Sequence, residues 1–133
     1  MPAFLNKAQN NIIVAETLID SDILITSAHP AYYAAFLSMK YVLAHFGGMD
    51  YDKQDKCKNE KGSHNYLSSL ALPLMSKLDT ETGNDYFVWY NKLKKLRKTA
   101  DYKPDDIEDD VLKDNLATAK SFMTSIESNF KTA

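Results

Sequence analysis

The segment Ser27–Phe46 limits what this chain can fold into more than any other part of the sequence. Lys40 is its only lysine, arginine, aspartate or glutamate, and apolar side chains would surround a helix of this length on nearly every side. Pro30 is tolerated in the first turn of a helix, and the pair Gly47 and Gly48 is a stop signal after it. A helix with this pattern is central in its fold, or a partner chain covers its second apolar face.

Helical periodicity recurs along the rest of the chain and predicts four more helices. We expect them at residues 6–19, at 63–78, from 84 or 85 to 100, and from about 106 onward. Pro73 should kink the second of these or end it early. The connections are short except for residues 49–62, which favours antiparallel neighbours. The pattern therefore predicts an all-α fold, an up-and-down bundle of about five helices.

Spacings of three and four residues place an apolar face on each of these helices. The last helix steps by four and three in turn, which suits packing along another helix of a bundle. Residues 49–62 alternate lysines with acids and are typical of a solvated loop. The predicted faces are Ile12, Ala15 and Ile19; Tyr66, Leu67, Leu70, Leu74 and Leu78; Trp89, Leu93, Leu96, Arg97 and Ala100; and Leu112, Leu116, Ala119, Met123, Ile126 and Phe130.

The length of 133 residues predicts one domain that spans residues 1–133. The single cysteine, Cys57, excludes an intrachain disulfide, and the first residues lack the features of a signal peptide. No apolar run is long enough for a membrane span. We therefore expect a soluble, cytoplasmic protein. The net charge of −2 argues against a general nucleic-acid coat protein but leaves room for a local basic patch.

Three segments share their order and spacing with one known family. Ala31–Phe36 reads AYYAAF and is followed by Lys40 and Gly47, Lys61–His64 reads KGSH, and Leu96–Tyr102 reads LRKTADY. They resemble the Tyr-Tyr-Ala signature, a recurrent histidine at the start of the next helix, and the Arg…Ala-Asp-Tyr ending of HEPN domains. The resemblance covers residues 31–102 and leaves the first and last helices without a specific motif.

The resemblance implies an up-and-down helical bundle that dimerises through its long central helices. Many HEPN proteins are metal-independent endoribonucleases, in which an Arg and a His four to six residues later meet their copies in a cleft at the dimer interface. Others lack this motif and bind RNA, nucleotides or proteins, and some are encoded beside a minimal nucleotidyltransferase as toxin–antitoxin pairs. Here Arg97 matches the motif, but Tyr102 stands five residues later and no histidine follows His64.

Four residues are therefore candidates for a catalytic or ligand-binding site. Arg97 could bind a phosphate with its fork of donors, or it could pair with Asp101 or Asp105 at the helix end. Tyr102 could bind a phosphate or hold Arg97, or it could pack against the helix end. Asp101 is a possible base or a solvated acid. His64 could supply the proton transfer that position 102 lacks, or it is a surface histidine at a helix start.

Basic and aromatic residues complete the list of candidates. Lys92, Lys94, Lys95, Lys98 and Lys103 surround Arg97 in the sequence and predict a polyanion-binding patch, or merely a solvated helix face. The aromatic residues Tyr32, Tyr33 and Phe36 are expected in the core or in a dimer interface rather than stacked on bases. The three histidines are too scattered for a metal site, and we expect neither a metal nor a cofactor.

Two functions follow from these candidates. The first is a homodimeric helical module that binds RNA, a nucleotide or a partner protein, including one of nucleotidyltransferase type, without catalysis. The second is an endoribonuclease of the toxin type, which would use Arg97 together with His64 or Tyr102 in an altered pair.

Overall fold

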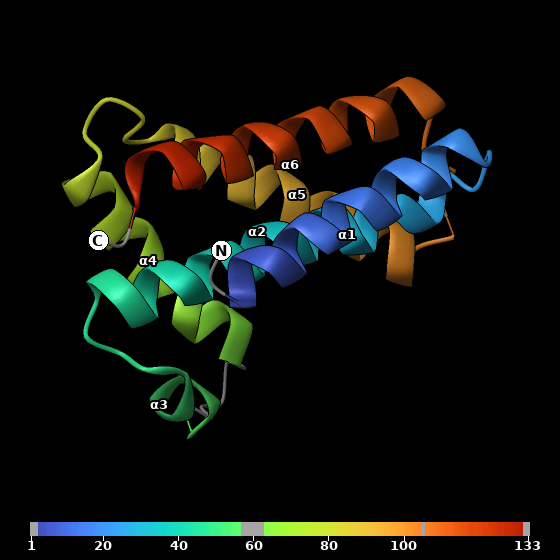
Figure 1. Cartoon of the computed structure of the whole chain (residues 1–133). Coiled ribbons are helices and arrows are strands. Elements are labelled where there is room, and N and C mark those ends of the chain that lie inside the picture. The colour runs from blue at the N-terminus through green and yellow to red at the C-terminus, as the bar shows by residue number, and fades with distance from the viewer. Residues whose placement is uncertain (1–2, 57–62, 105, 132–133) are drawn as a thin grey trace.

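Helix α2, Ala28–Phe46, runs through the centre of a bundle of antiparallel helices (Figure 1). The computed structural model describes residues 3–56, 63–104 and 106–131, and in these ranges it contains helices and no strand. The order of elements is α1 (Ala3–Asp20), the short 3-10 helix η1 (Ile25–Ser27), α2 (Ala28–Phe46), α3 (Tyr51–Lys56), α4 (Ser63–Leu78), α5 (Asp85–Tyr102) and α6 (Asp109–Asn129). The predicted all-α class is confirmed.

Helix α2 packs against α1, α4, α5 and α6 and touches α3. Its apolar residues are therefore covered on every side within one chain, and Tyr32, Met39 and Val42 are fully buried. Of the two alternatives that the sequence left open for this helix, the central position is the correct one. The apolar surface of α2 consequently needs no partner chain to cover it.

The ends of the helices meet at two ends of the bundle. The turn from α1 through η1 into α2, the last residues of α5 and the first turn of α6 lie at one end, which we call the η1 end (Figure 1). Helix α3 and the turn between α4 and α5 lie toward the opposite end (Figure 1). Among the described residues, no helix is both long and apolar enough to cross a membrane.

The predicted loop 49–62 is wrong at its start, because residues 51–56 form helix α3. Gln54 is 1% exposed, and its Nε2 donates to the backbone oxygens of Lys40 and Met49, each at 2.9 Å. Asp50 accepts from the backbone N of Lys53 at 2.9 Å and so stabilises the first turn. The rest of the predicted loop, including Cys57, lies outside the described residues.

The apolar face predicted for α4 is correct at Leu67, Tyr66 and Leu74, which pack against the core, but wrong at Leu70 and Leu78. Helix α4 buries Leu67, Ala71, Leu72 and Met75, whereas Leu70 and Leu78 are 39% and 52% exposed. Pro73 does not end the helix, which continues to Leu78. Pro73 itself is exposed, so solvent can satisfy the carbonyl that would otherwise have bonded to its missing N–H.

The remaining boundaries and faces agree in part. Helix α5 extends to Tyr102 rather than Ala100. Leu93 of its predicted face is buried, and Trp89, Leu96 and Ala100 pack partly buried against the core, whereas the burial of Tyr86 and Tyr90 was not predicted. Helix α1 begins at Ala3, and α6 begins at Asp109 rather than near Asp106. The apolar seam of α6 is confirmed, since all six of its residues are buried: Leu112, Leu116, Ala119, Met123, Ile126 and Phe130.

A buried carboxylate ties the turn after α4 to the end of α6. Asp79 is 9% exposed and accepts hydrogen bonds from Tyr86 Oη at 2.6 Å, Asn129 Nδ2 at 2.9 Å and the backbone N of Thr82 at 3.3 Å. Burial alone would raise the pKa of Asp79, but the hydrogen bonds from Tyr86, Thr82 and Asn129 outweigh it and lower that pKa below its ordinary value. The charged form of Asp79 is therefore the one that the fold stabilises.

Replacing Asp79 with Ala should lower the free energy of unfolding by about 1–3 kcal/mol at neutral pH, because the buried Tyr86 hydroxyl loses its acceptor. Since the native pKa of Asp79 is the lower one, the difference from wild type should shrink as the pH falls below about 4. Urea denaturation at neutral and acidic pH measures both effects. Glu81→Ala, at an exposed acid of the same turn, is the control. Equal losses for the two variants would contradict the assignment.

Candidate functional site

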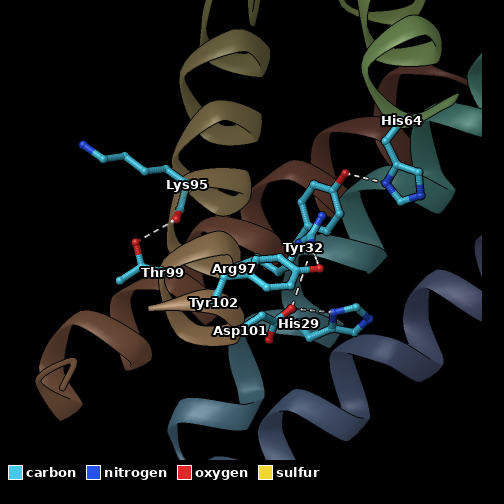
Figure 2. A network of polar contacts seen from close by, with 8 residues as sticks. All are labelled: His29, Tyr32, His64, Lys95, Arg97, Thr99, Asp101 and Tyr102. Atoms are coloured by element: carbon cyan, nitrogen blue, oxygen red, sulfur yellow. Dashed lines mark hydrogen bonds and ion pairs between the residues drawn. The ribbon is translucent and has the colours of Figure 1, made fainter. Parts of the chain in front are cut away.

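The hydroxyl group of Tyr32 is the centre of a polar network inside the bundle (Figure 2). Tyr32 is fully buried on α2, and its Oη lies 2.8 Å from His64 Nδ1 and 3.0 Å from Tyr90 Oη. A buried hydroxyl without partners would cost free energy, so these contacts fix α4 and α5 against this point of α2. The network therefore joins three helices that are distant in the sequence.

Arg97 lies against the same tyrosine. Its Cζ is 4.8 Å from the ring centroid of Tyr32 and 5.8 Å from that of Tyr102, and its side chain is 14% exposed. Position 97 is two turns after Tyr90 on α5, so both side chains point toward α2. The guanidinium is thus held between two aromatic rings, a favourable arrangement for a cation.

The polar contacts of Arg97 are long. Its Nη1 donates to Tyr102 Oη at 3.4 Å and pairs with Asp101 Oδ2 at 3.7 Å. The Nε atom of Arg97 is buried and has no hydrogen-bond partner within the described part of the chain. The ion pair expected with Asp101 is therefore present, but it occupies only part of the donor capacity of the guanidinium.

Asp101 has a second partner, which the sequence did not reveal. Its Oδ2 lies 3.3 Å from His29 Nδ1, at the start of α2, and the His29 ring stacks on Tyr33 with centroids 5.7 Å apart. His29 is exposed. Asp105, the other acid considered for Arg97, lies outside the described residues.

His64 is half-buried rather than a freely solvated surface residue. Its ring stacks on Phe36 with centroids 3.9 Å apart and an interplanar angle of 9°. Burial lowers the pKa of His64, and the nearby charges of Arg97, Lys40, Lys94 and His29 lower it further. The neutral imidazole therefore predominates near pH 7, and a neutral ring can accept a proton.

The lysines of α5 fall into two groups. Lys94 is half-buried and donates to Asn65 Oδ1, while Lys95 and Lys98 on α5 and Lys103 just after it are exposed. Burial lowers the pKa of Lys94, and the charges of Lys98 and Arg97 lower it further. Such mutual repulsion indicates a positive potential over this part of α5. Lys95 extends away from Tyr32 (Figure 2), and Lys92 pairs with Asp114 at 2.5 Å.

The structure brings all four predicted catalytic candidates together. We use the name Arg97 cluster for Arg97, Asp101, Tyr102, Tyr32, His64 and His29. Tyr102 is 72% exposed, at the outer edge of the cluster. Phe36 is buried behind His64 at 4% exposure, and Tyr33 is half-buried beside it. Tyr32 and Phe36 are therefore core residues of the single chain.

Sequence reasoning missed His29 and Tyr90. Helical spacing places both on the same face as a residue of the cluster, because His29 stands one turn before Tyr32 and Tyr90 stands two turns before Arg97. The contacts of these residues across the bundle had no local signal in the sequence. A groove of about 300 Å³ lies between α1 and α6, and a larger one lies at the η1 end. Both are lined by residues outside the Arg97 cluster.

Chemically, the Arg97 cluster brings together a guanidinium whose polar contacts are long, an exposed phenol and a neutral imidazole in a region of positive potential. A guanidinium and a phenol are donors that suit phosphate oxygens. A neutral histidine could serve as a base toward a ribose hydroxyl. The cluster therefore fits an anionic ligand.

Comparison with known proteins gives one match. The family model described as HEPN domain matches residues 1–129. No curated protein and no solved structure matched the chain.

The titration of His64 tests the geometry of the cluster. In the wild-type protein the pKa of His64 should lie below 6.5, and Arg97→Gln should raise it because a nearby positive charge is removed. The chemical shift of the ring Cε1–H, followed by NMR against pH, measures both values. Lys95→Gln removes the same charge from the exposed side of α5 and should move the pKa less. Equal shifts in the two variants would contradict the placement of Arg97 beside His64.

Proposed function

The chain belongs to the HEPN domain family, and from this premise we propose that it is a helical module that binds RNA through the Arg97 cluster without cleaving it. The observation that supports this most strongly is the state of Arg97. Its guanidinium is held between Tyr32 and Tyr102, its one ion pair is long, and its Nε is unpaired within the described residues. The Nε atom is buried, so the terminal nitrogens, whose contacts with Tyr102 and Asp101 are long, are the donors that a phosphate group would reach.

The surrounding charge supports the same proposal. Lys94, Lys95, Lys98 and Lys103 lie on or directly after α5, and the lowered pKa of Lys94 reflects burial and the neighbouring charges of Lys98 and Arg97. Several cations along one helix can contact successive phosphates, whereas a free nucleotide would engage fewer of them. The exposed ring of Tyr102 offers a surface on which a base could stack.

The absence of catalysis is proposed because position 102 holds a tyrosine. The phenol of a tyrosine is protonated at neutral pH and is therefore a poor general base. The alternative, a metal-independent endoribonuclease, is favoured by one specific observation. His64 contacts Tyr32, on which Arg97 stacks, and its lowered pKa keeps the imidazole neutral. In that case His64 would be the base and Arg97 would stabilise the phosphate.

Binding to a short single-stranded RNA, followed by fluorescence anisotropy, should weaken in Arg97→Gln and in the triple variant K94Q/K95Q/K98Q. If the triple variant loses three phosphate contacts, the slope of log affinity against log salt should become shallower by about 2. The triple variant K53Q/K77Q/K131Q changes the net charge equally at exposed lysines elsewhere and should bind nearly as wild type. Equal weakening in both triple variants would contradict a specific site.

The same RNA, incubated with the protein in EDTA and examined on a denaturing gel, separates the two functions. Intact RNA is the expected result. Cleavage that disappears in Arg97→Ala and in His64→Gln would replace the binding proposal with the endoribonuclease.

The setting that we propose is the cytoplasm, with the module as a homodimer. Leu70 and Leu78 leave an apolar ridge exposed on the outer side of α4, and such a ridge is suited to burial against a second copy. A nucleotidyltransferase-type protein, as implied for some HEPN modules, is a further proposed partner.

Light scattering should give a mass of about twice the 15.1 kDa of one chain. Leu70→Ser combined with Leu78→Ser should shift that mass toward a single chain, because the apolar ridge is lost. Val14→Ser, at an exposed valine of α1, is the matched control and should leave the dimer intact. A wild-type protein of single-chain mass at all concentrations would contradict the homodimer.

A further inference from the structure

A groove at the η1 end of the bundle is separate from the Arg97 cluster. It has a volume of about 630 Å³ and is lined by the turn after α1, by η1 and by the start of α6. Leu24 and Leu112 form its floor and, with Ala28, make a small second core at this end of the molecule. The lining residues are Asp22, Ile23, Leu24, Ile25, Asp106, Ile107, Asp109 and Leu112.

The mouth of this groove is apolar. Ile23 is 51% exposed and Ile25 is 40% exposed, and the half-buried Ile107 adds a third branched side chain to the lining. Single exposed apolar residues are ordinary on a protein surface, but several around one hollow are typical of a binding surface. The apolar side chains here surround a groove that is already formed.

Three aspartates also line the rim of the groove, and their negative charge is not balanced by a cation of the described chain. No ion pair joins Asp22, Asp106 or Asp109 to another residue of the described chain. Asp109 lies in the first turn of α6, where an acid complements the helix macrodipole. That explanation does not extend to Asp22 and Asp106, which lie outside the helices.

We infer that this groove docks an amphipathic helix of a partner protein, one that presents leucine or other aliphatic side chains beside lysines or arginines. The apolar floor and mouth would receive the aliphatic face, and the three carboxylates would pair with the flanking cations. A nucleic acid does not fit, because its phosphates would be repelled by the rim. The docking surface therefore differs in charge from the Arg97 cluster and goes beyond the function proposed for that cluster.

A fluorescent peptide of leucine and lysine at helical spacing is a direct probe. Titration with the full chain should give saturable binding, and the same peptide with glutamate in place of lysine should not bind. The triple variant D22N/D106N/D109N should weaken binding by about tenfold, since three charge contacts are lost. Asn tolerates the positive φ of 60° that Asp22 adopts, so these substitutions preserve the backbone.

The triple variant D52N/E81Q/D85N removes the same charge from exposed acids away from the η1 end and should bind the peptide within about twofold of wild type. Ile23→Ser tests the apolar contact separately and should also weaken binding. NMR shifts induced by the peptide should centre on residues 22–25 and 106–112, a readout that does not depend on whether a variant folds.

Three results would overturn the inference. The first is equal binding of the lysine peptide to both triple variants, and the second is a set of NMR shifts centred elsewhere on the chain. The third is a homodimer, seen by light scattering, that D22N/D106N/D109N disrupts and D52N/E81Q/D85N does not. That result would make a second copy of this chain the occupant of the groove.

Discussion

The need to satisfy one buried phenol determines how the candidate site of this bundle is arranged. Tyr32 is fully buried on the central helix, and a hydroxyl in that position must find partners inside the protein. It finds them in His64 of α4 and Tyr90 of α5. Because these contacts fix both helices against α2, they also bring Arg97 onto the face of the same ring. The polar network and the candidate site are therefore one arrangement.

The surface charge of the molecule is divided between two regions of opposite sign. At the end of the bundle where α5 finishes, the side chains of α5 carry an excess of positive charge, whereas the turn after α1 and the start of α6 carry acids that have no ion pair within the described residues. Neither region is evident in the net charge of −2. Averages over a composition cannot reveal opposite patches that the fold places near one another.

Sequence reasoning succeeded where the pattern was strong and local. The all-round apolar segment became the central helix, and the regular steps of α6 became a buried seam. It failed at Leu70 and Leu78 of α4, because Leu72, on another side of the helix, is also apolar and periodicity alone does not say which side packs inward. It failed on α3 because the burial of Gln54 depends on the carbonyl of Lys40, fourteen positions earlier.

The sequence predicted only the part of the candidate site that depends on local spacing. Arg97, Asp101 and Tyr102 are within two turns of one helix, so their proximity follows from spacing. The position of His64 beside Tyr32 was suggested only by the order of motifs in the HEPN resemblance, and it required the packing of α4 on α2. The contact between His29 and Asp101 joins residues 72 positions apart, and no local pattern in one sequence carries that information.

The carboxylate of Asp101 gives the cluster a built-in competitor. Under the proposed function, an arriving phosphate would compete with Asp101 for Arg97, and the carboxylate would keep His29 as its other neighbour. A single phosphate would gain little from this exchange, whereas a chain of phosphates that also reached the lysines would gain further contacts. Selection for polymeric over monomeric anions would then arise from one side chain, without any shaped pocket.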